Sequence, residues 1–151
     1  MQQNSTIKDE EELMTRKELE QIYYLNKELR MWERELERQR GKSLIQSPLP
    51  SAVHGSEISD KVGSLAEKRV DLERLVQDKQ AEIQQLKDKA VEYINTIPDS
   101  LTRQIIYYHC VSLFSWRRVA HEVGGYNTEE SVKKAYYRFF EKQKICPECP
   151  E

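Results

Sequence analysis

The sequence predicts an all-α protein in which a long antiparallel helical hairpin or coiled coil is followed by a C-terminal helix-turn-helix domain. Apolar residues recur at spacings of three and four along two long, charged segments. One third of the residues are charged, which favours long solvated helices with a narrow seam over a single globular core. Three short amphipathic segments then follow within residues 99–141, and Gly124-Gly125 separates the second from the third.

Residues 1–40 are expected to form a charged N-terminal helix with one apolar stripe. Its acidic and mixed-charge runs, at 9–12 and 33–40, are interpreted as solvated helix surface. Residues 41–57 contain two prolines, two glycines and several serines, and are therefore expected to form a flexible loop. The apolar stripe consists of Leu19, Ile22, Leu25, Leu29, Trp32 and Leu36.

Residues 58–97 are expected to form one long helix with a heptad seam, interrupted at Arg69 and Lys79. Such a seam needs a partner helix. The length of the loop allows the first helix to fold back on the second, and it equally allows a homodimer through the coiled coil. The seam positions are Ile58, Val62, Leu65, Arg69, Leu72, Val76, Lys79, Ile83, Leu86, Ala90, Tyr93 and Ile97.

Residues 98–145 are expected to form the helix-turn-helix. Pro98 ends the long helix, and Asp99 or Ser100 starts the next one. Ser115 is the expected N-cap of the second helix of the domain, and Asn127 or Thr128 that of the third. The expected buried faces are Leu101, Ile105, Tyr108 and Val111 in the first helix, Trp116, Val119, Ala120 and Val123 in the second, and Val132, Ala135 and Phe139 in the third.

Gly124 is expected to have two roles in this domain. It can adopt the left-handed backbone that stops a helix, and it supplies a small residue where two helices cross closely. The turn that it begins, Gly-Gly-Tyr-Asn at 124–127, is slightly longer than is usual between such helices.

The charge of this domain favours double-stranded DNA as its partner over a protein that would bind the polar face of a three-helix bundle. Residues 101–145 contain eight basic and four acidic residues, although the whole chain has a net charge of -2. Lys133, Lys134 and Arg138 are expected to lie on the third helix away from its buried face, where a polyanion could meet them. The predicted DNA-binding residues are Arg117, Arg118, Thr128, Ser131, Lys133, Lys134, Tyr137, Arg138 and Lys142.

Glu129 and Glu130 occupy the first turn of the third helix, where they would repel phosphate. They can stabilise the helix N-terminus through its dipole, or one of them can accept a hydrogen bond from a cytosine amino group. Under the dipole interpretation Ser131, Lys134 and Arg138 are the base-reading candidates. Lys133, Tyr137 and Lys142 then lie nearer the DNA backbone.

Two runs in this domain resemble region 4 of sigma-70-type factors: Leu-Thr-Arg-Gln-Ile-Ile at 101–106 and Ser-Trp-Arg-Arg-Val-Ala-His-Glu-Val-Gly at 115–124. The whole layout is similar to phage-encoded transcriptional regulators of the RinA/ArpU type. This resemblance implies that the chain binds promoter DNA, engages the host RNA polymerase and activates late phage genes. It also implies that residues 128–142 lie in the major groove, with Arg117 and Arg118 near phosphates.

The same sequence also bears on metal binding and catalysis. Cys146 and Cys149 have the spacing of a zinc-binding pair, but only His109, Cys110 and His121 are near enough in sequence to complete a site, so no metal and no cofactor is expected. No phosphate loop or catalytic group at recognisable spacing is present, so the chain is not expected to be an enzyme.

Two further functional classes remain open, a small terminase-like DNA-packaging subunit and a coiled-coil scaffold that binds another protein.

No apolar run is long enough to cross a bilayer, and residues 1–5 do not resemble the start of a signal peptide. The expected location is therefore the cytoplasm, and the resemblance to phage regulators implies that of a bacterial host cell.

Overall fold

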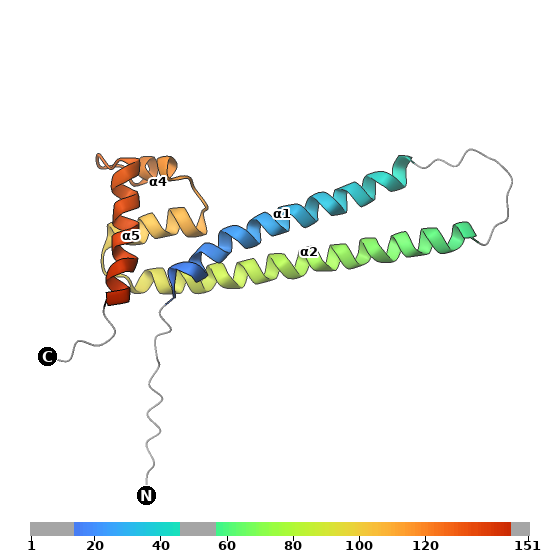
Figure 1. Cartoon of the computed structure of the whole chain (residues 1–151), viewed down its shortest axis with the longest axis horizontal. Helices are drawn as coiled ribbons and strands as arrows, with labels where there is room; N and C mark the ends of the chain where they lie inside the picture. Colours follow the sequence, from blue (N-terminus) through green and yellow to red (C-terminus); the bar gives the residue numbers. More distant parts are fainter. Residues whose placement is uncertain (1–13, 46–56, 146–151) are drawn as a thin grey trace, which may run out of the picture. The chain divides into compact units, whose positions relative to one another are not determined.

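The computed structural model describes residues 14–45 and 57–145, and within them every regular element is a helix (Figure 1). This confirms the all-α prediction. None of the helices in these two ranges is both long and apolar enough to cross a membrane. The elements are α1 (Arg16–Ile45), α2 (Glu57–Thr96), α3 (Ser100–Ile106), the π-helix η1 (Tyr107–Val111), α4 (Trp116–Val123) and α5 (Glu129–Ile145).

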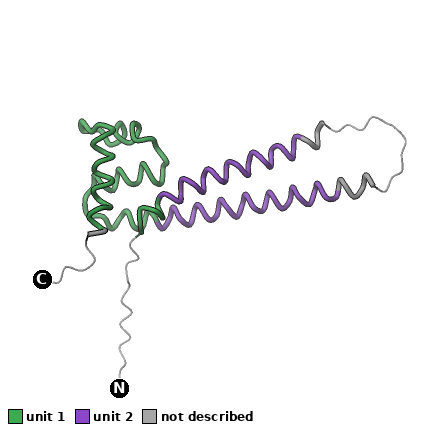
Figure 2. Tube along the Cα trace, viewed as in Figure 1, with its two compact units in different colours: residues 1–19, 90–151 green, residues 20–89 purple. Residues whose placement is uncertain are grey.

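The chain divides into two compact units, which Figure 2 shows in different colours. Unit 1 combines residues 1–19 with 90–151, and unit 2 is residues 20–89. In unit 2, α1 and α2 run antiparallel and are joined by ion pairs. The Lys79 ammonium lies 3.6 Å from the Glu28 carboxylate, and the Arg40 guanidinium lies 2.9 Å from that of Glu73. The structure therefore has the predicted hairpin within one chain.

The hairpin seam follows the predicted periodicity. Ile22 and Leu36 of α1 are buried, as are Val76 and Ile83 of α2, while most other seam positions are half-buried. Leu65 is 45% exposed, so the seam weakens toward the start of α2. The seam is narrow because only two helices share it.

The two polar interruptions of the seam have different surroundings. Lys79 is half-buried and is flanked by Glu28 from α1 and by Glu82 at 3.1 Å from its own helix. This places two carboxylates beside the charge and limits the cost of its burial. The Nε atom of Arg69 is buried and has no hydrogen-bond partner among the described residues.

The ends of the hairpin helices differ slightly from the predicted ranges. Gly41–Ile45, assigned to the loop, continue α1, and α2 begins one residue early at Glu57. The remainder of the predicted loop, 46–56, lies outside the described residues, as do residues 1–13 of the predicted first helix. α1 begins at Arg16 because Thr15 and Glu18 form a capping box. The Thr15 N–H donates to Glu18 Oε2 at 2.6 Å, and the Glu18 N–H donates to Thr15 Oγ1 at 3.3 Å.

In unit 1 the predicted helix caps are in place. The Asp99 carboxylate accepts hydrogen bonds from the Thr102 N–H at 2.9 Å and the Thr102 hydroxyl at 2.5 Å, which lowers the pKa of Asp99. The Ser115 hydroxyl accepts from the Arg118 N–H at 3.4 Å, and the Thr128 hydroxyl accepts from the Ser131 N–H at 3.2 Å. Thr128 rather than Asn127 therefore caps α5.

The buried face of the first helix of the domain was predicted wrongly. Leu101 is 38% exposed, and Tyr108 and Val111 are only half-buried, whereas Ile105 is buried as expected. Thr102 can be buried because its hydroxyl donates to Asp99 and is not left unsatisfied. The helix then widens into the π-turn η1, in which the Ser112 N–H bonds to the Tyr107 carbonyl five residues earlier at 3.0 Å. The buried set is Thr102, Ile105, Ile106 and Cys110.

The buried face of α5 is also rotated from the prediction. Val132 is buried as expected, but Ala135 and Phe139 are only half-buried. Tyr136 and Phe140 are buried in their place, at 1% and 4% exposure. The spacing of four fits a helix equally well, and it places two large rings in the core instead of an alanine. In α4, Val119 and Ala120 are buried as predicted.

Candidate nucleic-acid interface

Tyr136 anchors α5 against η1 and α4. Its ring meets those of His109, Trp116 and Phe140 edge-on, with centroids 5.4, 5.2 and 4.9 Å away. Its hydroxyl lies 3.6 Å from the Sγ atom of Cys110. His109 and Trp116 also stack on each other, with ring centroids 3.6 Å apart. This cluster fixes which side of α5 faces the core and therefore which side faces solvent.

The outward side of α5 carries Lys134 and Arg138. Both side chains are exposed, and because they are four residues apart they share one helix face. In the described part of the chain, no carboxylate lies within ion-pair distance of either cation. Lys142, also exposed, follows four residues later. These three predicted site residues therefore form a single basic row, which we call the α5 row.

Thr128 and Ser131 cap the start of α5 by hydrogen-bonding to each other. The Thr128 N–H donates to Ser131 Oγ at 2.9 Å, the Ser131 hydroxyl donates to the Thr128 carbonyl at 2.9 Å, and the Thr128 hydroxyl accepts the Ser131 N–H. Both residues are exposed at the start of the helix. Their hydroxyls are engaged in holding the first turn, so they are less available to read bases than the sequence suggested.

Lys133 does not lie on the α5 row. Its ammonium pairs with the Glu129 carboxylate at 2.8 Å, one turn earlier. One residue turns an α-helix by about 100°, so Lys133 lies on the flank of α5 beside Lys134 rather than on the same face. The expectation that Lys133, Lys134 and Arg138 share one surface is therefore wrong for Lys133. The pair also neutralises Glu129, which removes one of the two acids that would repel phosphate.

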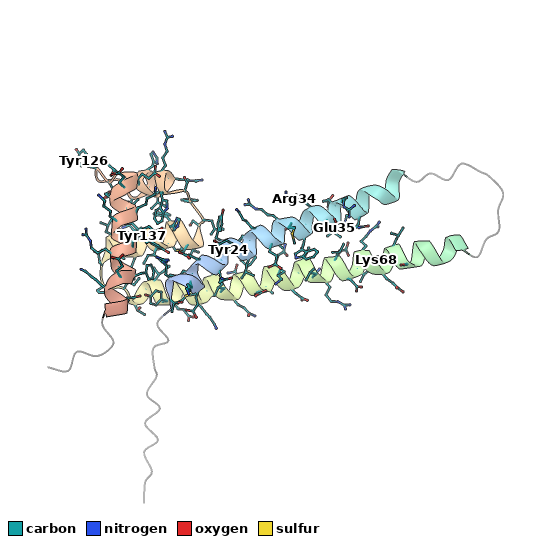
Figure 3. All side chains as sticks on the ribbon, in the orientation of Figure 1. Tyr24, Arg34, Glu35, Lys68, Tyr126 and Tyr137 are labelled. Carbon is teal, nitrogen blue, oxygen red and sulfur yellow. The ribbon has the colours of Figure 1, made fainter. Side chains whose placement is uncertain are left out.

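Tyr137 lies on the same flank as Lys133 and packs against its neighbours. Its ring is tilted against Trp116 with centroids 6.3 Å apart, and the Arg16 guanidinium of α1 lies 5.4 Å from its centroid. The side chain is nevertheless 42% exposed, as predicted for a surface position, and it is labelled in Figure 3. Tyr137 therefore links α1 to α5 within unit 1 and presents only one edge to solvent.

The two arginines at the start of α4 differ in their surroundings. Arg117 is exposed, and no described residue pairs with its side chain. The Arg118 guanidinium lies over the Phe114 ring, 3.7 Å from its centroid, and 3.6 Å from the Glu122 carboxylate. Arg118 is thus held against the protein, and Arg117 is the α4 cation better placed to meet a phosphate.

The turn between α4 and α5 contains three consecutive positive φ angles, 66° at Gly124, 64° at Gly125 and 64° at Tyr126. A Cβ added at Gly124 would meet nothing within 4 Å, so the expected close helix crossing at this residue is wrong. Its φ of 66° and ψ of -151° lie in a region that essentially only glycine adopts. Tyr126 is fully exposed at the tip of the turn (Figure 3).

The candidate zinc ligands do not form a metal site in the described part of the chain. His109 Nδ1 lies 3.2 Å from the Phe114 carbonyl, and Cys110 is buried next to Tyr136. Cys146 and Cys149 lie outside the described residues. Within those residues, no three His, Cys, Asp or Glu side chains are grouped as a metal ion requires.

Two cation–π contacts that support the interface were not predicted, that of Arg118 with Phe114 and that of Arg16 with Tyr137. The contact of Arg118 with Phe114 has a local signal, since an aromatic residue and an arginine four positions apart meet at the helix start. The contact of Arg16 with Tyr137 joins positions that are far apart in the chain and has no such signal.

In comparisons with models of protein families, with curated proteins and with solved structures, no match to this chain was found.

Proposed function

We propose that this chain is a phage or prophage transcription regulator that binds promoter DNA through α5 and activates late genes in the cytoplasm of a bacterial host. One observation carries the proposal. Lys134 and Arg138 stand exposed and unpaired among the described residues, on the helix that follows the turn, while Val132, Tyr136 and Phe140 bury its opposite side. A helix held in this way can enter a major groove without disturbing the core.

The role proposed for each side chain in binding DNA follows from its contacts within the protein. Arg138 and Lys134 meet base edges, where an arginine can bond both acceptors of a guanine. Arg117 and Lys142 meet phosphates. Thr128, Ser131, Lys133, Tyr137 and Arg118 hold the interface in shape, and their contact with DNA is secondary. The similarity of residues 101–106 and 115–124 to region 4 of sigma-70-type factors supports the same orientation, with the host RNA polymerase as a second partner.

The test is a gel-shift measurement with duplex DNA from upstream of neighbouring operons and with a shuffled duplex, at two salt concentrations. The unaltered chain is expected to prefer one upstream duplex, and the preference is expected to disappear in the Lys134→Ala/Arg138→Ala variant. The matched control is Arg74→Ala/Lys89→Ala, which removes the same charge from exposed positions of α2. A helical circular dichroism signal equal to that of the unaltered chain confirms that the variants are folded.

Three results would contradict the proposal. A footprint that survives the Lys134→Ala/Arg138→Ala change removes α5 as the reading element. A ring of many subunits, seen when molar mass is measured in parallel, favours a packaging subunit. Absence of duplex binding at low salt, together with a recovered protein partner, favours a coiled-coil scaffold.

A further inference from the structure

Tyr126 lies at the tip of the turn between α4 and α5, away from the core of unit 1. It is fully exposed (Figure 3), and among the described residues neither its ring nor its hydroxyl has a partner. Packing therefore does not explain why this position carries a large aromatic residue. The other exposed tyrosines of the described chain each have a ring contact, Tyr23 with Tyr24, Tyr107 with Tyr108, and Tyr137 with Trp116.

The backbone at Tyr126 also has a conformation that is unfavourable for a tyrosine. Its φ of 64° lies in the left-handed region, where a bulky residue is an outlier. Gly124 and Gly125 adopt positive φ without a side-chain clash, but Tyr126 has a Cβ that does not. No contact of the side chain within the described chain offsets this strain. Backbone strain that a fold maintains without such a contact is concentrated at sites of function.

The turn holds Tyr126 in a fixed place at the start of α5. The Gly124 carbonyl accepts hydrogen bonds from the Asn127 N–H at 3.2 Å and from the Asn127 side-chain amide at 2.8 Å. Thr128, two residues after Tyr126, caps α5. Tyr126 thus lies between a closed turn and a capped helix end, so little ordering is needed when it meets a ligand.

The charges around the turn allow an anion to approach. Glu122, near the end of α4, lies 3.6 Å from the Arg118 guanidinium, and Glu129 pairs with Lys133 at 2.8 Å. In the described part of the chain, Glu130 has no cation at ion-pair distance. Two of the three acids that flank the turn are therefore compensated by a neighbouring cation.

We propose that the Tyr126 hydroxyl donates a hydrogen bond to a phosphate of the duplex that α5 enters. The inference rests on the function proposed for α5. A helix with its side chains is about 10–12 Å across and the major groove is about 12 Å wide, so the chain leading into the helix passes beside a sugar-phosphate strand. Tyr126 lies three positions before Glu129, the first residue of α5. Tyrosine is one of the side chains that bond to phosphate oxygens.

A contact from a tyrosine differs in two measurable ways from the contacts of the α5 row. The hydroxyl is neutral, so its loss should leave the slope of log affinity against log salt concentration unchanged. Loss of one lysine–phosphate contact should reduce that slope by about 0.9. The hydroxyl also meets no base edge, so its loss should weaken binding to every duplex alike.

The test measures the affinity of full-length variants for the upstream and the shuffled duplex at several salt concentrations. Tyr126→Phe removes the hydroxyl and keeps both the ring and the backbone conformation. It is expected to weaken binding to both duplexes by about tenfold, the loss typical of a hydrogen bond to a charged group, with the salt slope unchanged. The matched control is Tyr24→Phe, which removes the hydroxyl of an exposed tyrosine in α1 and is expected to leave binding unchanged.

Modified DNA locates the contact. Duplexes are prepared in which one phosphate at a time is replaced by an uncharged methylphosphonate. At one linkage, the replacement is expected to weaken binding by the unaltered chain more than binding by Tyr126→Phe, because the hydroxyl that meets this phosphate is already absent from the variant. An equal penalty in both proteins at every linkage would overturn the inference.

A second variant separates contact with DNA from support of the fold. Asparagine tolerates the left-handed conformation, so Tyr126→Asn is expected to leave the melting temperature unchanged or to raise it. It should nevertheless bind DNA as weakly as Tyr126→Phe. A lowered melting temperature would show that the tyrosine supports the turn, and would overturn the inference.

The remaining outcomes distinguish this inference from the proposed function. Full affinity in Tyr126→Phe together with weak binding by Tyr126→Asn would assign the contact to the ring and overturn the phosphate bond. If Lys134→Ala/Arg138→Ala abolishes the preference between duplexes while Tyr126→Phe binds like the unaltered chain, the inference fails alone. If the unaltered chain binds no duplex, the function proposed for α5 fails, and the role of Tyr126 fails with it.

Discussion

Unit 1 packs large side chains around a small core, whereas unit 2 buries one narrow row between two helices. In unit 1, Tyr136, Ile105 and Val132 are almost fully buried, and the Tyr136 ring of α5 meets rings of η1 and α4 edge to face. In unit 2, Ile83 and Val76 are buried, while charged pairs such as Arg40–Glu73 lie on the surface. Exposed ion pairs contribute little to stability, so the stability of each unit should depend on a few apolar residues. Truncating one of them should destabilise unit 1 more than unit 2.

The largest expected effect is at Tyr136. Tyr136→Ala removes the ring that contacts His109, Trp116 and Phe140 and leaves a cavity, which should lower the free energy of unfolding of unit 1 by about 3–5 kcal/mol. Urea denaturation followed by circular dichroism and tryptophan fluorescence measures it. A loss below about 1 kcal/mol would show that the aromatic cluster does not hold α5 in place.

The matching change in the hairpin is Ile83→Ala. Ile83 is 5% exposed in the seam, so its truncation should cost about 2–4 kcal/mol, and the lost signal should belong to α1 and α2. Hydrogen exchange resolved along the chain distinguishes the two units. Equal loss of protection in α5 would contradict the division of the chain into separately stabilised regions.

Alanine substitutions at two glycines compare the turn of unit 1 with a helix of unit 2. An added Cβ meets nothing within 4 Å at either Gly124 or Gly63. Gly124→Ala should nevertheless destabilise unit 1 by about 1–3 kcal/mol, because its backbone angles are strained for alanine. Gly63→Ala, within α2, should stabilise the hairpin by about 0.5–1 kcal/mol. Thermal melting of both variants checks the prediction, and shifts of the same sign would refute it.

The smallest expected loss of stability is at the cap of α3. Asp99→Ala should cost about 1 kcal/mol at neutral pH, since the Thr102 N–H loses its acceptor. Hydrogen bonds from Thr102 lower the pKa of Asp99, so the stabilisation is present above the ordinary carboxyl pKa and is lost as pH falls below about 4. Melting curves of the two proteins should therefore converge in acid. A gap that persists at pH 2 would show that the carboxylate charge is not involved.

The features that were predicted correctly depend on local rules. Alternation of three and four fixed the seam of the hairpin, and the N-caps at Asp99, Ser115 and Thr128 follow from side chains that reach a neighbouring N–H. The predicted exposure of Lys134 and Arg138 is confirmed for the same reason, because each lies opposite the buried stripe of one helix.

The features that were missed depend on competition between distant groups. Both Ala135 with Phe139 and Tyr136 with Phe140 fit a helical stripe beginning at Val132, and only contacts with His109 and Trp116 decide between them. The π-turn at Tyr107–Val111 has no pattern in the sequence that separates it from an α-helix. The pairing of Lys133 with Glu129 has the spacing of an ordinary helix pair, but its consequence for the interface required knowledge of the buried face.

The central claim is that the α5 row reads sequence, and it is tested most directly by measuring discrimination between duplexes. The dissociation constants for a bound duplex and for single-base substitutions of it are compared in the unaltered chain, in Arg138→Ala and in Arg74→Ala. The account predicts that Arg138→Ala lowers the discrimination at one base pair by about 1–3 kcal/mol and leaves the others intact, while Arg74→Ala changes none. Equal weakening on every duplex by Arg138→Ala would contradict it.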